Sequence, residues 1–318
     1  MPETEIRSAH AGELRKVLRL TLATRGQAAS ELERQVTAFI GYARELSIDL
    51  GRHWICTRDG RPLTAGTLIK SPGRTATLLL PDSGTAPVDP PTLADLISRA
   101  VAGISKRDVR LLQCLVHPDD SVTLMALEKA GFRPLAMLRY LEWIASEQVL
   151  GHQQPPESLA DRTIEWITYD HRHHDEFAEL ISATYEDSLD CPGLCGLRHI
   201  DDVMEGHKAA GRFDPQRWML LRCDGEAAGC ILFAENPLRA TLELVYMGVH
   251  PKFRRMGLGT LLLNHGLAPA HDLAFVSVTV AVDDENTRAR KMYERAGFRT
   301  TTRRRALIHT LSSTRAGA

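Results

Sequence analysis

Apolar residues recur along this chain in two similar series of predicted elements. In the first half, apolar positions at helical spacing predict helices over residues 11–25 and 28–46, and the second half has a corresponding helix over residues 174–185. A β-hairpin is predicted after each helical part, because apolar runs flank Asp-Gly turns at residues 58–61 and 223–226. The common order predicts two copies of one domain.

A second repeat supports this division. Residues 119–133 and 285–299 each place acidic or amide residues before a short predicted helix, end that helix at Ala-Gly-Phe-Arg and continue into a strand. Between the copies, residues 151–160 are polar and proline-containing, without an apolar period. We therefore expect an N-terminal domain over residues 1–150, a linker over residues 151–163 and a C-terminal domain over residues 164–318.

Composition agrees with two globular domains and excludes some partners. The chain has 318 residues, of which 43% are apolar and 25% charged, and its formal net charge is −1, so no overall field favours nucleic acid or an acidic membrane. No basic leader followed by an apolar run opens the chain, which favours a cytoplasmic protein. Six cysteines are too few for a disulfide scaffold at this length, so reduced thiols are expected.

A glycine-containing loop in the second half predicts an anion site. Residues 241–249 have the pattern of a buried strand, and Arg254-x-x-Gly257-x-Gly259 then leads into a helix. Glycine lets the backbone approach a ligand, and the first N–H groups of a helix lack acceptors within it, so together they suit a pyrophosphate. The corresponding residues 80–91 of the first half contain several prolines and no basic residue, which predicts a degenerate first domain.

Two side chains near this loop are candidates for acid–base chemistry. Glu243 is a carboxylate among apolar strand residues, where a charge is costly unless it is used or is paired with Arg222 or Arg239. Tyr293 lies on the helix predicted after the next strand, and a core aromatic is the alternative interpretation. Residues 275–282 form that second buried strand, so a parallel pair with a helical crossover is expected. If the pair splays apart, a thiol-bearing arm fits between the two side chains.

These motifs resemble those of the GNAT (Gcn5-related) N-acetyltransferase superfamily. The loop Arg254-Arg-Met-Gly-Leu-Gly259 is similar to its Arg/Gln-x-x-Gly-x-Gly/Ala signature, and Asn286, Tyr293 and Ala296-Gly-Phe298 resemble its later motif. The tandem layout is similar to that of the mycothiol synthase family, in which the C-terminal domain is the active one. The resemblance implies an α+β (mixed α/β) fold of two tandem GNAT-like domains, each a mixed central sheet flanked by helices with a splayed parallel strand pair.

The resemblance also implies acetyl-CoA as co-substrate. Backbone groups of the strand before the loop would pair with the pantetheine arm, the loop amides would hold the pyrophosphate, and Lys252, Arg254 and Arg255 would add charge. The expected cofactor-binding residues are Met247, Gly248, Val249, Arg254, Arg255, Met256, Gly257, Leu258, Gly259, Thr260, Asn286 and Arg290.

Direct acetyl transfer needs a base and an acid but no metal. An alkyl ammonium has a pKa of about 10 and must lose a proton before it attacks. The resemblance assigns this step to Glu243, with Tyr293 protonating the departing thiolate. Tyr185, Asp187 and Ser188 follow the first helix of the second half, where relatives place acceptor contacts, although polar turn chemistry alone also explains them. The expected acceptor is an amine of a small molecule.

Alternative functions stay open at this point. A protein or peptide N-acetyltransferase would use the same cofactor loop, and a non-catalytic acyl-CoA-binding regulatory module would need that loop without Glu243 and Tyr293. The basic residues between 288 and 305 fall on several faces, which favours solvated side chains with a few near the cofactor phosphates over a nucleic-acid patch.

Cysteines and histidines, which are common metal ligands, occur together between residues 191 and 207. Cys191 and Cys195 precede His199 and His207, but a Cys-x3-Cys spacing with proline and glycine inside it does not match common zinc sites. The sequence therefore predicts loop or buried thiols and no metal.

Overall fold

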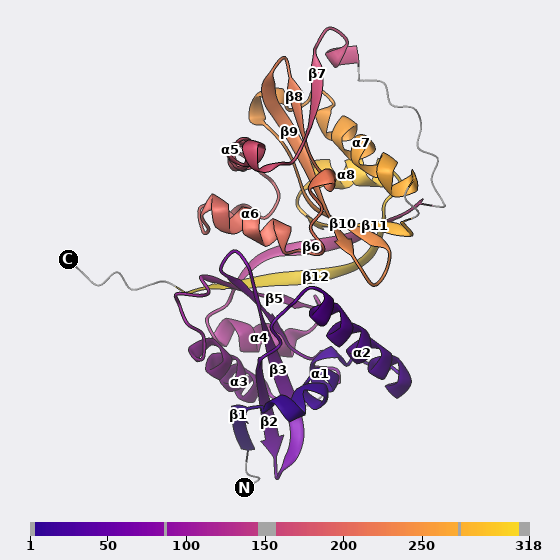
Figure 1. Cartoon of the computed structure of the whole chain (residues 1–318). Helices are drawn as coiled ribbons and strands as arrows, with labels where there is room; N and C mark the ends of the chain where they lie inside the picture. The colour runs from indigo at the N-terminus through magenta and orange to yellow at the C-terminus, as the bar shows by residue number, and fades with distance from the viewer. Residues whose placement is uncertain (1–3, 86–87, 146–156, 273–274, 312–318) are drawn as a thin grey trace, which may run out of the picture. The chain divides into compact units, whose positions relative to one another are not determined.

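The computed structural model of the chain describes residues 4–85, 88–145, 157–272 and 275–311, in two compact units (Figure 1). The first unit comprises Met1–Met137 and Arg303–Ala318, and the second comprises Leu138–Thr302. Residues 151–156 of the predicted linker lie outside the described residues. Within the described residues, no helix is long and apolar enough to cross a membrane.

The sheet of the first unit runs in the order β1-β2-β3-β4-β5-β12. Neighbouring strands are antiparallel except β4 and β5, which are parallel and are connected through α3. The strands are β1 (Thr4–Ser8), β2 (Arg52–Arg58), β3 (Arg61–Ser71), β4 (Thr75–Leu79), β5 (Leu111–Val116) and β12 (Arg299–Thr310). The α-helices are α1 (Leu14–Leu22), α2 (Ala29–Glu45), α3 (Pro90–Ala102) and α4 (Ser121–Lys129).

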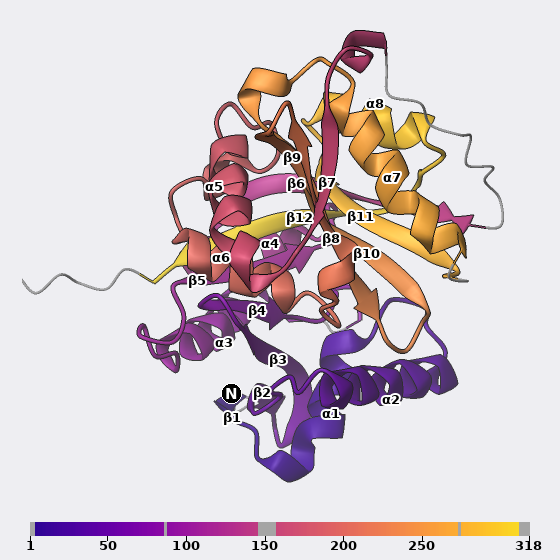
Figure 2. The ribbon, with the colours of Figure 1, turned by 45° about the horizontal axis from the view of Figure 1, so that its top comes forward.

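The sheet of the second unit repeats this plan in the order β7-β8-β9-β10-β11-β6, with β10 and β11 as its parallel pair. Helices α5 and α6 lie on one side of this sheet, and α7 and α8 lie on the other (Figure 2). The strands are β6 (Arg133–Ile144), β7 (Ile164–Thr168), β8 (Trp218–Cys223), β9 (Glu226–Asn236), β10 (Thr241–Val249) and β11 (Ser277–Asp283). The helices are α5 (His174–Thr184), α6 (Ile200–Lys208), α7 (Leu258–Asp272) and α8 (Thr287–Arg295).

Each unit is completed by a strand from the other half of the sequence. Residues 138–144 of β6 pair with β11, and their Trp143 is fully buried in the core of the second unit. Residues 305–310 of β12 pair with β5, and their Leu307 is fully buried in the core of the first unit. The boundary expected from the sequence follows chain order, whereas the contacts assign these two strand segments across it.

The predicted hairpins and the mixed α+β class are confirmed. In both hairpins the Asp-Gly pair adopts positive φ, with 50° at Asp59 and 73° at Gly60, and 52° at Asp224 and 81° at Gly225. Two residues with positive φ match the right-handed twist of the flanking strands, which is why Asp-Gly is favoured there. Strand β7 and helix α6 were not expected from the apolar pattern.

Candidate active site

The parallel strands β10 and β11 separate halfway along their length. Their register runs from Thr241 opposite Ser277 to Leu244 opposite Val280, although β10 continues to Val249. An irregularity in the pairing of β10 with β9 lies between Leu244 and Tyr246, and a bulge of this kind bends a strand away from its neighbour. The predicted splay is therefore present.

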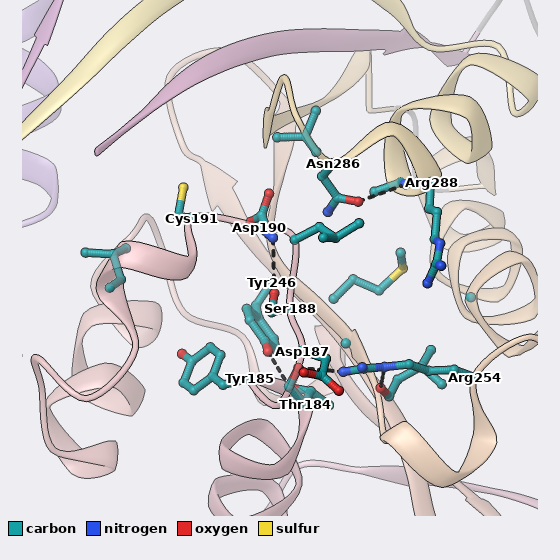
Figure 3. Close-up of a pocket in the computed structure, with 18 of the residues that line it drawn as sticks. Thr184, Tyr185, Asp187, Ser188, Asp190, Cys191, Tyr246, Arg254, Asn286 and Arg288 are labelled. Atoms are coloured by element: carbon teal, nitrogen blue, oxygen red, sulfur yellow. Dashed lines mark hydrogen bonds between the residues drawn. The ribbon is translucent and has the colours of Figure 1, made fainter. Parts of the chain in front are cut away.

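A cavity of about 590 Å³ fills the wedge between the separated strands. Residues 245–249 of β10 and 280–282 of β11 line it from the two sides. Figure 3 shows Tyr185 and Cys191 at one side of this cavity and Arg254 and Arg288 at the other. The backbone of β10 beyond the bulge thus faces an open space wide enough for an extended ligand.

The bulge also decides which side chains of β10 face each helix layer. Leu242 and Leu244 belong to the core formed with α7, whereas Tyr246 packs against the cluster formed by α5 and α6. The hydroxyls of Tyr246 and Thr184 are hydrogen bonded. A Cβ atom at Gly248 would lie 2.9 Å from side-chain atoms of Thr184, so only glycine allows this close approach of α5 to the strand.

The glycine loop has the geometry of an anion site. Arg255 has φ 67° and Gly257 has φ 84°, and α7 begins at Leu258. Left-handed residues close together aim neighbouring N–H groups into one concavity, and the first amides of α7 add unpaired donors and the positive end of the helix dipole. Gly259 also faces the sulfur of Met292 at 3.3 Å from an added Cβ, so this glycine serves helix packing as well.

The first arginine of the loop is bound to protein rather than free for a ligand. The Arg254 guanidinium donates to the carbonyl oxygens of Val249 at 3.2 Å, Thr184 at 2.9 Å and Glu186 at 2.6 Å. Lys252 forms an ion pair with Glu226. The positive charges of Arg254 and Lys252, which were expected to face the cofactor, are therefore bound in part by protein oxygens. Arg254 holds the carbonyl groups at the C-terminal end of α5 against the glycine loop.

Two other arginines line the cavity at this end. Among the described residues, the side chains of Arg255 and Arg288 have no ion-pair or hydrogen-bond partner. Arg290, which the sequence analysis proposed, instead donates to the Asp284 carbonyl at 2.7 Å and pairs with its carboxylate at 3.2 Å. Arg288 was missed because helical spacing alone does not show which of two arginines on α8 faces the wedge.

Most of the predicted cofactor residues line the cavity. Met247, Gly248, Val249, Arg254, Arg255, Gly257, Leu258, Gly259 and Asn286 do so, whereas Met256, Thr260 and Arg290 are not part of the lining. Asn286 is the N-cap of α8, and its side-chain oxygen accepts from the Ala289 amide at 3.2 Å.

Tyr293 and Glu243 occupy different environments. Tyr293 lines the cavity and is only 5% exposed, and burial raises the pKa of its phenol, so the hydroxyl stays protonated at neutral pH. Glu243 lies on β10 before the bulge, outside the residues that line the cavity. Its side chain reaches solvent, while surrounding protein atoms raise the pKa of its carboxyl by desolvation. Arg222, one of its possible partners, is bound by Glu176 at 2.7 Å.

The opposite end of the cavity is formed by the segment between α5 and α6. Tyr185, Asp187 and Ser188, the expected acceptor contacts, line the cavity, with Asp187 drawn beside Arg254 (Figure 3). Asp190, Arg198 and His207 also line it and were not expected there. The Asp283 amide donates to the Asp190 carboxylate at 2.9 Å, and the Cys191 amide donates to the Asp283 carboxylate at 3.2 Å. These paired bonds fix the segment to the end of β11.

The cysteines considered as metal ligands lie in the segment before α6. Cys191 and Cys195 are free thiols, and burial raises the pKa of the Cys191 thiol. In the part of the chain that the structure describes, no group of three or more histidine, cysteine or acidic side chains is arranged to hold a metal ion.

The equivalent place in the first unit has a different chemistry. Helix α3 follows β4 as α7 follows β10, but it opens with two prolines, and the side chain of its N-cap Asp89 accepts from the Thr92 amide at 2.9 Å. A carboxylate already occupies the helix N-terminus there, so a phosphate would be repelled.

Comparison with known proteins agrees with this geometry. The sequence profile of the acetyltransferase (GNAT) family matches residues 178–298. An uncharacterized N-acetyltransferase of Mycobacterium tuberculosis is 28% identical over 131 residues, which cover 39% of this chain and 82% of that protein. A mycothiol acetyltransferase of Propionibacterium freudenreichii is 28% identical over 139 residues, covering 42% of this chain and 43% of that protein.

A solved structure of a tandem GNAT protein has a similar fold. A tandem GNAT protein from the clavulanic acid biosynthesis pathway matches with a TM-score of 0.53 at 17% identity, over 98% of this chain and 100% of its own. The splayed strand pair with its glycine loop thus defines a GNAT acetyltransferase domain. The second unit therefore contains a domain of the GNAT acetyltransferase family, with the family motifs, and the protein is an acyltransferase.

Proposed function

We propose that the second unit binds acetyl-CoA and transfers the acetyl group to an amine of a small molecule. One observation carries the proposal: a single cavity joins the glycine loop and Arg288 at one end to Tyr293 and the polar segment after α5 at the other. A phosphate-binding end and a polar acceptor end in one wedge suit a long cofactor that meets a second substrate.

The wedge fits the parts of acetyl-CoA in order. The unpaired edge of β10 between the bulge and Val249 offers backbone groups to the pantetheine amides. The loop amides and Arg255 suit the pyrophosphate, and Arg288 suits a further phosphate. When bound, acetyl-CoA supplies a thioester, which is an activated acetyl group.

The acid and base are assigned to Tyr293 and Glu243. A phenol with a raised pKa keeps its proton at neutral pH and so can protonate a departing thiolate, and Tyr293 lines the cavity. Glu243 lies on β10 three residues before Tyr246, so we assign it proton removal through a water molecule. A raised carboxyl pKa makes this glutamate a better base than an ordinary surface glutamate.

A small acceptor is supported by the size of the cavity and by a relative. Pockets for small ligands measure roughly 300–1,000 Å³, and this cavity of about 590 Å³ must hold part of the cofactor as well. The mycothiol acetyltransferase relative is named for a small-molecule acceptor. In this proposal the first unit has no acetyl-CoA site, because Asp89 caps the helix that corresponds to α7.

The test is acetyl-CoA-dependent release of CoA thiol against a panel of small amines and peptides, with acetyl-CoA binding measured separately by calorimetry. We expect binding with a stoichiometry of one and turnover with small amines, which Tyr293→Phe slows without weakening cofactor binding. Binding without turnover on any amine or peptide would favour a non-catalytic acyl-CoA sensor. Turnover confined to peptides would favour a protein N-acetyltransferase.

A further inference from the structure

The acceptor end of the cavity contains one cation that the protein does not neutralise. Arg198 directly precedes His199, the N-cap of α6, and its half-buried side chain lines the cavity. Among the described residues it has neither a hydrogen-bond nor an ion-pair partner. Arg254 and Arg222, by contrast, are each held by several protein oxygens.

Arg198 acts electrostatically on two aromatic side chains of one ring cluster, Tyr185 and His207. Tyr246 contacts the Tyr185 ring at a centroid distance of 6.1 Å and the His207 ring at 5.1 Å. Burial, with the positive charge of Arg198 as a second cause, lowers the pKa of His207 to about 4, so its imidazole is neutral at neutral pH. Its Nε2 atom is buried without a hydrogen-bond partner among the described residues. A guanidinium beside neutral rings lacks the counter-charge that a half-buried cation normally has.

Asp190, a carboxyl that also lines the cavity, is not paired with Arg198. Asp190 accepts from the backbone amide of Asp283, and desolvation and the Asp283 charge raise the pKa of its carboxyl. Both Arg198 and Asp190 act electrostatically on Tyr185, yet they form no ion pair with each other. The acceptor end therefore presents a cation and a carboxylate at separate places, which is the pattern complementary to a zwitterion.

We propose that the acceptor is an amine that also carries an anionic group, a carboxylate in its simplest form, which the Arg198 guanidinium binds while the amine lies toward Asp190. This inference rests on the proposed acetyl transfer. The guanidinium has parallel N–H donors that match the two oxygens of a carboxylate or phosphonate. The acceptor class is thus that of amino acids and related aminoalkyl acids.

The experiment compares matched acceptors of similar length: an amino acid, its amide, an aminoalkyl phosphonate and a simple alkyl amine. We expect kcat/KM for the two anionic amines to exceed that for the amide and the alkyl amine on the order of 10- to 100-fold, as loss of a charge-assisted hydrogen bond gives. The ratio of kcat/KM for the amino acid to that for the aminoalkyl phosphonate shows which anion the site prefers.

Variants locate the effect at Arg198. Arg198→Gln is expected to lower kcat/KM for the anionic amines to the value for the alkyl amine, and Arg198→Lys is expected to restore part of the preference. Arg198→Glu should reverse the preference toward a diamine. Arg255→Gln is the matched control, because it removes a free arginine at the cofactor end, and it should leave the ratio of anionic to neutral acceptors unaltered.

A binding measurement separates this inference from the proposed activity. With CoA present, the N-acetylated acid should bind more tightly than the N-acetylated amide to the native protein and equally to Arg198→Gln. Equal use of anionic and neutral amines, or a preference that survives Arg198→Gln, overturns the inference while acetyl transfer stands. No turnover of any amine despite acetyl-CoA binding overturns the proposed function itself, and equal binding of the two acetylated compounds then overturns the inference too.

Discussion

The Arg254 guanidinium lies 2.9 Å from the carbonyl oxygen of Thr184, so the beginning of the glycine loop is tied to the last residue of α5. Helix C-termini leave carbonyl groups without intrahelical donors, and a cation there is favourable. The same guanidinium also binds Val249 and Glu186. One side chain thus connects the cofactor end of the cavity to the segment that forms the acceptor end.

Replacing Arg254 should therefore affect folding and binding together. Arg254→Ala removes hydrogen bonds from a charged donor, each worth about 1.5–3 kcal/mol, so we expect a fall of at least about 2 kcal/mol in the free energy of unfolding and weaker acetyl-CoA binding. Urea denaturation and calorimetry measure the two effects.

Arg255→Ala is the control, because Arg255 has no partner among the described residues. It should weaken acetyl-CoA binding and leave the urea midpoint unchanged. If Arg254→Ala leaves the midpoint unchanged as well, the proposed tie between loop and helix contributes nothing to stability.

The exchanged strands make each unit depend on the other half of the sequence. Trp143 of β6 is fully buried in the second unit, and Leu307 of β12 is fully buried in the first. Large-to-small changes in cores cost about 3–5 kcal/mol for tryptophan and about 2–5 kcal/mol for leucine. Trp143→Ala should destabilise the acetyl-CoA-binding unit although it lies in the first half of the chain, and Leu307→Ala should destabilise the other unit.

Thermal unfolding with and without acetyl-CoA distinguishes the two variants. A ligand raises the melting temperature of the unit that binds it. We expect Trp143→Ala to lower the ligand-dependent transition and Leu307→Ala to lower a transition that acetyl-CoA does not shift. The opposite assignment of the two variants would contradict the exchange of strands.

The sequence predicted local features well and missed features that depend on distant pairing. The strand that contains Glu243 and the helix that contains Tyr293 follow from apolar spacing and glycine signals within short windows. The exchange of β6 and β12 is invisible in such windows, because local spacing predicts a strand but not the distant strand with which it pairs. Arg198 was missed because it lies in a segment without apolar period, and only the fold brings that segment to the wedge.

Gly248 tests how closely α5 approaches β10. An added Cβ would lie 2.9 Å from the Thr184 side chain, within a strand segment that also lines the cavity. Overpacking of this kind costs about 1–3 kcal/mol. Gly248→Ala should lower the unfolding free energy by that amount and weaken acetyl-CoA binding.

A second change relieves the same clash. Combining Gly248→Ala with Thr184→Ala removes two of the side-chain atoms that the new Cβ would meet, so part of the stability lost in Gly248→Ala should return. A double-mutant cycle measured by urea denaturation gives the coupling between the two positions. Strictly additive losses would show that the close approach is not the cause.

Because the pKa of Glu243 is raised, replacing this residue should raise the stability of the protein at neutral pH and lower its activity. The folded chain holds a proton on this carboxyl at pH values above 4.5, its ordinary pKa, where the unfolded chain has lost it. Stability therefore falls as pH rises from 4.5 through the folded pKa, and Glu243→Gln should be more stable than the native protein at pH 7 but not at pH 4.

The activity of Glu243→Gln should change in the opposite direction to its stability, because the proposed base works only when it is ionised. We expect Glu243→Gln to slow turnover at neutral pH, with the gap narrowing as pH approaches the amine pKa of about 10, where free amine is abundant. Asp190→Asn is the comparison, since Asp190 is the cavity-lining carboxyl with a raised pKa. If pH profiles of kcat show that Asp190→Asn loses the acid limb and Glu243→Gln keeps it, proton removal belongs to Asp190 instead.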